Sequence, residues 1–306
     1  MARYVNVAAV QFQTAAVRGK RTARKIVLRE LRDTLGGLRG YGIQLAVFCE
    51  SVEAFAQDLQ TAEEAAHPGP VLQAYLDFAA REKCHVAGSA KLREGNNVYN
   101  SLAFIGPEGR VLGAYHKVNL TVGEIKEHGL RSGSHAAVVD TPVGRLGGAI
   151  CFDLNFDEVR NEYRRLKPDI LCFASNYHGG LMQAVWAYQC RAYFVSALPF
   201  FGAGILDPFG RPIKLTDCYS SVARATINLD RVMVHLDDNR ARFPDIERKY
   251  RGEVVVDIPP DIGPALIFSL TEKRTAMDVV REFGLELIDD YFARSLAANA
   301  ANRAAT

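Results

Sequence analysis

Short apolar runs of strand length alternate with amphipathic segments along most of the chain. Val5–Phe12 and Gln44–Phe48 have the apolar character of buried strands, whereas Arg21–Leu38 repeats its apolar residues at helical spacing. Pro68-Gly69-Pro70 opens a second helix that is predicted to run to about Lys83. Further strands are predicted at residues 85–92, 98–105, 111–118, 136–140, 145–151, 169–175, 195–198, 204–206 and 223–229, and helices at 157–167 and 182–193. Strands interleaved with helices, some paired as hairpins, predict an α/β protein with mixed sheets and helices on their outer faces.

The pattern changes after Pro259-Pro260. Thr275–Phe283 and Leu287–Ala297 are predicted helices, and the Ala-rich stretch that follows is expected to fray. We therefore expect one domain over residues 1–260. Residues 261–306 are expected to form a helical extension that packs on that domain or on a partner subunit.

Composition limits the classes of partner. The hydrophobic fraction of 48% and charged fraction of 24% are typical of a globular protein. Lys+Arg (37) and Asp+Glu (35) nearly balance, with no dense basic stripe, so nucleic acid is not an expected partner. The sequence contains neither a secretory signal pattern nor a run of about 20 apolar residues. We expect a cytoplasmic protein with no membrane partner.

Cysteine and histidine spacing argues against a metal or disulfide protein. No two cysteines form a CxxC pair, and the seven histidines form no HxxxH or HExxH pair. The cysteines are Cys49, Cys84, Cys151, Cys172, Cys190 and Cys218. We expect neither a metal nor another cofactor.

Three reactive side chains stand where apolar strands are predicted to end: Glu50, Lys117 and Cys151. Active sites of open α/β sheets gather at such positions. A cysteine at a strand-to-helix turn can be a nucleophile, and the positive end of the following helix is expected to favour its thiolate. A lysine beside it can stabilise an oxyanion, and a glutamate can act as general base. Taken singly, Cys151 is more typical of a core cysteine, Lys117 of a lysine that reaches solvent and Glu50 of a solvated strand-end carboxylate, so only the three together indicate a site.

These residues lie in three ordered motifs. The motifs are Phe48-Cys49-Glu50, Tyr115-His116-Lys117-Val118-Asn119-Leu120 and Gly147-Gly148-Ala149-Ile150-Cys151-Phe152-Asp153. Lesser landmarks are His67-Pro68-Gly69-Pro70, Val98-Tyr99-Asn100-Ser101 and Asp207-Pro208-Phe209-Gly210. Over roughly residues 4–258 the chain resembles the nitrilase, or carbon–nitrogen hydrolase, superfamily.

The resemblance implies a four-layer α-β-β-α sandwich that forms a homodimer or larger homo-oligomer. It implies that Cys151 is the nucleophile, Glu50 the general base and Lys117 the stabiliser of the tetrahedral intermediate, with the Phe152 N–H as second oxyanion donor. Many members carry a second glutamate after the lysine motif. Glu124 fits this position, and Glu127 is its rival.

One detail departs from the family pattern: Cys49 stands where the family commonly has proline, which affects the turn that presents Glu50 but not the chemistry. Another bears on the substrate, because Phe152-Asp153 after the cysteine is closer to amide hydrolases than to true nitrilases. The implied substrate is a small amide or N-carbamoyl compound. Alternatives are a true nitrilase, a non-catalytic scaffold and a glutaminase-type ammonia donor.

Candidate substrate-binding residues follow the predicted strand at 169–175. Asn176, Tyr177 and His178 stand where this fold can place a pocket wall, although an ordinary Gly-rich loop is the alternative. Arg160, Arg164 and Arg165 are predicted to form the solvated face of the helix after Cys151.

Overall fold

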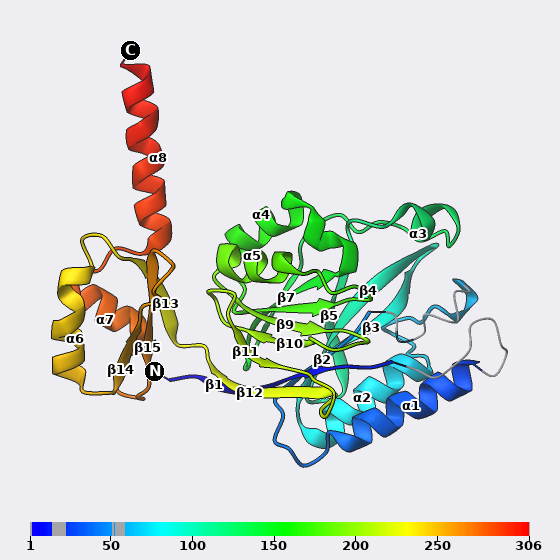
Figure 1. Ribbon diagram of the computed structural model, residues 1–306. Coiled ribbons are helices and arrows are strands. Elements are labelled where there is room, and N and C mark those ends of the chain that lie inside the picture. Colours follow the sequence, from blue (N-terminus) through cyan, green and yellow to red (C-terminus); the bar gives the residue numbers. More distant parts are fainter. Residues whose placement is uncertain (1, 14–22, 51, 53–58, 306) are drawn as a thin grey trace. The chain divides into compact units, whose positions relative to one another are not determined.

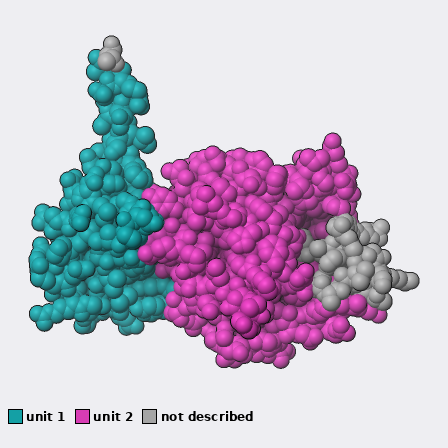
Figure 2. Space-filling model, in the orientation of Figure 1, with its two compact units in different colours: residues 1–4, 227–306 teal, residues 5–226 magenta. Residues whose placement is uncertain are grey.

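The computed structural model describes residues 2–13, 23–50, 52 and 59–305 (Figure 1). The chain divides into two compact units, coloured separately in Figure 2. One comprises Val5–Thr226, and the other comprises Met1–Tyr4 together with Ile227–Thr306. The sequence predicted a boundary at residue 260, whereas the contacts divide the chain at Ile227.

The larger unit is built on two six-stranded sheets. The first has the order β12-β1-β2-β3-β4-β5, with β1 to β3 parallel and β3 to β5 antiparallel. Its strands are β1 (Tyr4–Val10), β2 (Leu45–Phe48), β3 (His85–Glu94), β4 (Asn97–Gly106), β5 (Arg110–His116) and β12 (Val222–Asn228). The second has the order β11-β10-β9-β8-β7-β6, with β7, β8 and β9 parallel. Its strands are β6 (Val138–Thr141), β7 (Gly144–Ile150), β8 (Ile170–Ala174), β9 (Tyr193–Ala197), β10 (Gly204–Leu206) and β11 (Pro212–Leu215).

The two sheets face each other, because β2 contacts β8 and β9 while β4 and β5 contact β7. Helices α1 (Ala23–Gly37) and α2 (Pro70–Glu82) cover the outer face of the first sheet. Helices α4 (Asp157–Leu166) and α5 (Leu181–Cys190) cover the second (Figure 1). Strands β2, β8 and β9 are buried along their whole length, as strands covered on both faces must be. The predicted α-β-β-α sandwich is confirmed.

Three short helical elements complete this unit and lie near strand ends. They are the 3₁₀ turns η1 (Leu59–Thr61) and η2 (Cys151–Asn155) and the helix α3 (Val122–Lys126). The helix predicted at 157–167 is α4, which begins at Asp157, and the 3₁₀ turn η2 occupies the interval between Cys151 and that helix.

The smaller unit contains a three-stranded sheet that the sequence reading did not predict. Strands β13 (Arg231–His235) and β14 (Val254–Asp257) flank β15 (Pro264–Ser269), and both are antiparallel to it. Helix α6 (Phe243–Tyr250) connects β13 to β14, so the unit is a split β-α-β arrangement. The turn η3 (Arg240–Arg242) precedes α6, and α7 (Ala276–Phe283) and α8 (Ile288–Ala304) follow the sheet.

This unit has its own apolar core, which includes Val234, Ile246, Ile267 and Val279. The first residues of the chain belong to it: Leu229 N donates to Arg3 O at 2.9 Å, and Ala2 N donates to Thr271 O at 2.8 Å. Helix α8 continues to Ala304, so the expectation that the Ala-rich stretch frays was wrong. In the described part of the chain, no helix combines the length and apolar character that a membrane span needs.

Candidate active site

Glu50, Lys117 and Cys151 each follow directly or closely on a strand of the sandwich: β2, β5 and β7. The fold brings the first two into contact, since Lys117 Nζ lies 2.9 Å from Glu50 Oε1. Both are almost completely buried, with exposed fractions of 1% for Lys117 and 4% for Glu50. A buried ion pair of this kind is costly to build and is therefore a mark of a site.

A second carboxylate completes the coordination of the lysine. Glu124 Oε1 and Oε2 lie 3.0 Å and 2.9 Å from Lys117 Nζ. Glu124 is held at the start of α3 by a capping box, in which Thr121 Oγ1 accepts from Glu124 N and Glu124 Oε2 accepts from Thr121 N. Glu127, the rival in the sequence, is exposed at the end of α3. The structure places Glu124 against the lysine.

The cluster is charged. Burial disfavours the ammonium of Lys117, but Glu50, Cys151 and Glu124 outweigh it and raise the pKa of Lys117 above its ordinary value. Burial likewise acts against the charged form of Glu124, but Lys117 and hydrogen bonds from Thr121 and Asn100 lower the pKa of Glu124 overall. One ammonium and a carboxylate on each side of it thus share a small buried volume.

Cys151 is the first residue of η2 and has a φ of 47°, in the left-handed region that few non-glycine residues adopt. Burial and the negative charge of Glu50 raise the pKa of Cys151 to about 12, although Lys117 and a hydrogen bond with Ser175 act in the opposite direction. The expectation that a helix end favours the thiolate was therefore wrong. The resting sulfur is a thiol, and it needs a base to become a nucleophile.

The two glycines of the cysteine motif make room for aromatic rings. A Cβ on Gly147 would lie 2.7 Å from the ring of Tyr163, and one on Gly148 would lie 2.7 Å from Cβ of Tyr115. These close approaches bring β7 against β5 and against α4, the helix that carries Tyr163. The glycines thus set the depth at which the cysteine strand packs beside the lysine strand.

Asp153 ties the cysteine turn to the segment after the lysine. Its Oδ1 accepts from Asn119 N at 2.8 Å, and its Oδ2 accepts from Ile150 N at 3.0 Å. One donor, Asn119, lies two residues after Lys117, and the other, Ile150, lies directly before Cys151. The buried Asp153 carboxylate thus links the backbone beside the lysine to the backbone beside the cysteine.

Asn100 belongs to the cluster, although the sequence reading treated it only as a landmark of the β4 hairpin. Its Nδ2 donates to Glu50 Oε1 at 2.8 Å and to Glu124 Oε1 at 2.9 Å. Its backbone oxygen accepts from Lys117 N at 2.8 Å. A single asparagine in a strand has no distinctive spacing. The one sequence signal for Asn100 was its place in the segment Val98-Tyr99-Asn100-Ser101.

The residues predicted to bind substrate lie around the turns after β7 and β8. Asn176 contributes its backbone, whose N–H donates to Glu50 Oε2 at 3.0 Å, while its side chain is exposed. The hydroxyl of Tyr177 accepts from Asn155 Nδ2 at 3.4 Å, and burial together with Cys151 raises the pKa of Tyr177. The structure thus places Asn176 and Tyr177 beside the cluster.

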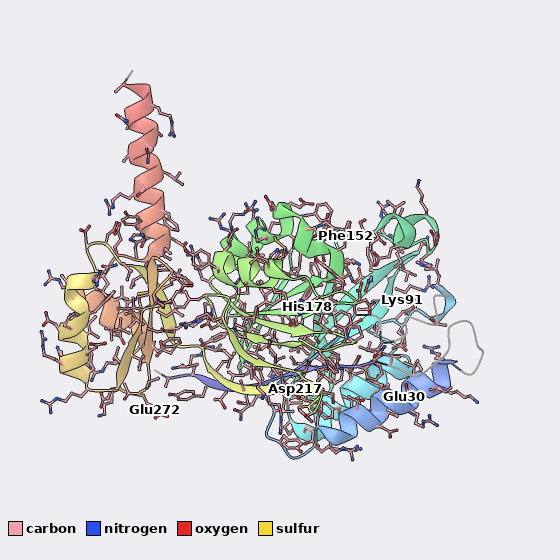
Figure 3. All side chains as sticks on the ribbon, in the orientation of Figure 1. Glu30, Lys91, Phe152, His178, Asp217 and Glu272 are labelled. Atoms are coloured by element: carbon pink, nitrogen blue, oxygen red, sulfur yellow. The ribbon has the colours of Figure 1, made fainter. Side chains whose placement is uncertain are left out.

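Phe152 and His178, both labelled in Figure 3, differ in their surroundings. Phe152 is 37% exposed and packs edge-to-face on Phe156 with ring centroids 5.1 Å apart. His178 turns onto its own loop, where its Nδ1 accepts from Gly180 N at 3.2 Å. These contacts give His178 a role in loop structure.

The arginines of α4 do not all lie where the sequence predicted. Arg164 and Arg165 are exposed, in agreement with the prediction. Arg160 is buried, and its guanidinium contacts Asp157 at 2.6 Å. The prediction for Arg160 was wrong because its position on α4 shares the inward face with Val159 and Tyr163.

The fold and this cluster define a class of hydrolase that is also recognised by sequence comparison. Residues 6–232 match the family model described as Carbon-nitrogen hydrolase. The chain belongs to the carbon–nitrogen hydrolase family, which is part of the nitrilase superfamily.

Among curated relatives, the chain is 25% identical to the chloroplastic omega-amidase of Arabidopsis thaliana over 199 aligned residues. The alignment covers 56% of this chain and 53% of the relative. It is 33% identical over 121 residues to Nitrilase 1 of the same plant, covering 39% of this chain and 35% of the relative. It is 25% identical to Omega-amidase NIT2 of Danio rerio, in an alignment that covers 61% of this chain and 75% of that relative. The match thus spans about half of the first relative and about a third of the second.

Solved structures show the same fold at lower identity. Nit3 of Saccharomyces cerevisiae gives a TM-score of 0.61 at 17% identity, covering 74% of this chain and 90% of that one. XC1258 of Xanthomonas campestris, a CN-hydrolase superfamily protein, gives a TM-score of 0.60 at 20% identity, covering 80% of this chain and 97% of that one.

Proposed function

We propose that this chain hydrolyses the carbon–nitrogen bond of a small amide or N-carbamoyl compound through a thioester on Cys151. The observation that carries the proposal is the buried Lys117 ammonium, held between Glu50 and Glu124 beside Cys151, whose pKa is raised by burial and by Glu50. The relatives named omega-amidases support an amide as the substrate class.

In the first step, Glu50 accepts the proton of the Cys151 thiol as the sulfur attacks the carbonyl carbon. The carbonyl oxygen takes up the electron pair, and Lys117 Nζ and the Phe152 N–H donate hydrogen bonds to it. Glu124 keeps the ammonium in position because both of its carboxylate oxygens contact Lys117.

In the second step, the C–N bond breaks and the proton on Glu50 passes to the nitrogen, so ammonia or an amine leaves and a thioester remains. Water then gives a proton to Glu50 and attacks the thioester carbon. The carboxylic acid, or carbamic acid, leaves, and the proton returns to the Cys151 sulfur.

The test is ammonia or amine release by the wild type and by Cys151→Ala across aliphatic amides, N-carbamoyl amino acids and nitriles. Cys218→Ala is the matched control, because Cys218 is an exposed cysteine outside the cluster. We expect release by the wild type and by the control, and none above background by Cys151→Ala. Equal release by Cys151→Ala would contradict the mechanism, and faster turnover of a nitrile than of its matching amide would favour a true nitrilase.

We further propose that the protein forms a homodimer or larger homo-oligomer, to which the C-terminal helix contributes. In support, α8 leaves Phe292 (38% exposed) and Leu296 (68%) uncovered in the single chain. Analytical ultracentrifugation of the full chain and of a chain ending at Leu287 tests this. A monomeric full chain would contradict the proposal, and an unchanged oligomer after truncation would exclude α8 from the contact.

A further inference from the structure

We propose that Asn100 is a positioning residue that keeps Glu50 and Glu124 ionised side by side on one lysine. This inference rests on the proposed function, because it concerns how the general base stays free of a proton. Asn100 is 3% exposed, and its Nδ2 lies 2.8 Å from Glu50 Oε1 and 2.9 Å from Glu124 Oε1. The same two oxygens contact Lys117 Nζ at 2.9 Å and 3.0 Å. Each Oε1 atom is therefore shared between the amide and the ammonium.

Charge balance explains why such a donor is needed. Two carboxylates that share a buried site repel each other, and one of them tends to keep a proton. Lys117 supplies a single positive charge for both. A primary amide has two N–H groups and no charge, so one Asn100 nitrogen can give one hydrogen to each carboxylate. It stabilises both charged forms without a second cation, which would compete with Lys117.

The orientation of the amide follows from the same contacts. If the amide were flipped, Asn100 Oδ1 would face two carboxylate oxygens and repel both. In the observed orientation, Asn100 Oδ1 is buried and makes no hydrogen bond to any described residue. The two glutamates therefore set the orientation of the amide, and this orientation leaves the Asn100 Oδ1 atom without a hydrogen-bond donor in the part of the chain that the structure describes.

The test uses Asn100→Leu, which removes both donors at similar size, and Asn100→Asp, which replaces them with a third carboxylate. Ser101→Ala is the matched control on the same strand, since the Ser101 hydroxyl contacts His116 Nδ1 at 2.8 Å instead. The readout is the rate at which iodoacetamide alkylates Cys151, followed by mass spectrometry between about pH 5 and pH 9. This readout needs no substrate. The pH profile of kcat/KM on the best amide is measured in parallel.

We expect the acid limb of the alkylation profile to move upward by about one pH unit in Asn100→Leu and further in Asn100→Asp. The sign follows because losing a donor, or adding a negative charge, makes the glutamates bind a proton at higher pH. Ser101→Ala should keep the wild-type profile. The loss of rate for Asn100→Leu should grow as pH falls and approach roughly tenfold only on the acid limb itself, below the shifted value.

A loss by the same factor at every pH, or a profile that matches Ser101→Ala, would overturn the inference and leave Asn100 a purely structural residue. If Asn100→Leu fails to fold in a thermal melt, the Asn100→Asp profile decides by the same criterion. A wild type that alkylates as expected but hydrolyses no member of the substrate panel would refute the proposed function while leaving the role of Asn100 intact.

Discussion

The hydroxyl of Tyr115 donates to Asp153 Oδ2 at 2.8 Å, and both residues are fully buried. Tyr115 lies on β5 two residues before Lys117, and Asp153 lies in η2 two residues after Cys151. This hydrogen bond therefore joins the lysine strand to the cysteine turn through side chains. It adds to the two backbone donors that Asp153 already accepts from.

Tyr115→Phe should destabilise the fold by roughly 1.5 to 3 kcal/mol at pH 7.5, because a buried carboxylate loses a donor. Burial raises the pKa of Asp153 to about 6, from an ordinary value of 3.8. The folded chain thus binds this proton more tightly than the unfolded chain, and the stability that Asp153 contributes falls as pH rises through that interval. The deficit of the variant should therefore be smaller at pH 5 than at pH 7.5 in urea melts. Tyr219→Phe, at an exposed ring, is the control, and an equal deficit at both pH values would contradict this account.

Lys117→Met should leave Glu50 and Glu124 facing each other without a cation. We expect a loss of about 3 to 5 kcal/mol at pH 7.5, as for other broken buried pairs. The pKa of Glu124 is lowered in the folded wild type, so the stability from this pairing is present above its ordinary value of 4.5 and is lost as pH falls. The difference between variant and wild type should therefore persist at pH 5 and shrink only as the pH falls below about 4.5. Lys249→Met, which removes an exposed pair with Glu282, should change little, and a loss independent of pH at Lys117 would argue against the charge explanation.

Gly148→Ala should cost about 1 to 3 kcal/mol, because the added methyl group would overlap the side chain of buried Tyr115. Gly36 near the end of α1 is a suitable control, since a Cβ there meets nothing within 4 Å. Gly36→Ala should stabilise the chain by about 0.5 to 1 kcal/mol. Chemical denaturation of both variants checks the contrast, which would fail if the two substitutions had effects of the same sign.

Cys151→Gly should be more stable than Cys151→Ala by about 1 kcal/mol, although glycine is normally the less stable of the two. The reason is the φ of 47° at this position, which strains any residue with a Cβ. Both variants lack the sulfur and should be inactive. Urea melts of the pair measure the difference, and an alanine variant as stable as the glycine variant would show that the turn relaxes.

The positions of Glu50, Lys117 and Cys151 were predictable because each ends an apolar run, and strand ends converge in a layered sandwich. The choice between Glu124 and Glu127 was not, since a difference of three residues on a short helix depends on the capping box at Thr121. Asn100 escaped notice for a related reason, because its role exists only once β4 lies beside β5.

The proton affinity of Cys151 was predicted with the wrong sign. The sequence shows a cysteine before a helix, but it does not show the intervening 3₁₀ turn or the carboxylate of Glu50 beside the sulfur. The strands of the smaller unit were also missed. Val254–Asp257 has four residues and Arg231–His235 has five, too few for a periodic signal to stand out.

The hydrogen bonds of Ala2 and Arg3 to Thr271 and Leu229 have a consequence for synthesis of the chain. Ala2 and Arg3 leave the ribosome long before their partners exist. The sandwich of Val5–Thr226 can begin to form during translation, whereas the smaller unit closes only after Thr271 has emerged. A bulky fusion placed directly before Ala2 would then hinder assembly of the smaller unit, although it precedes the whole sandwich in the sequence.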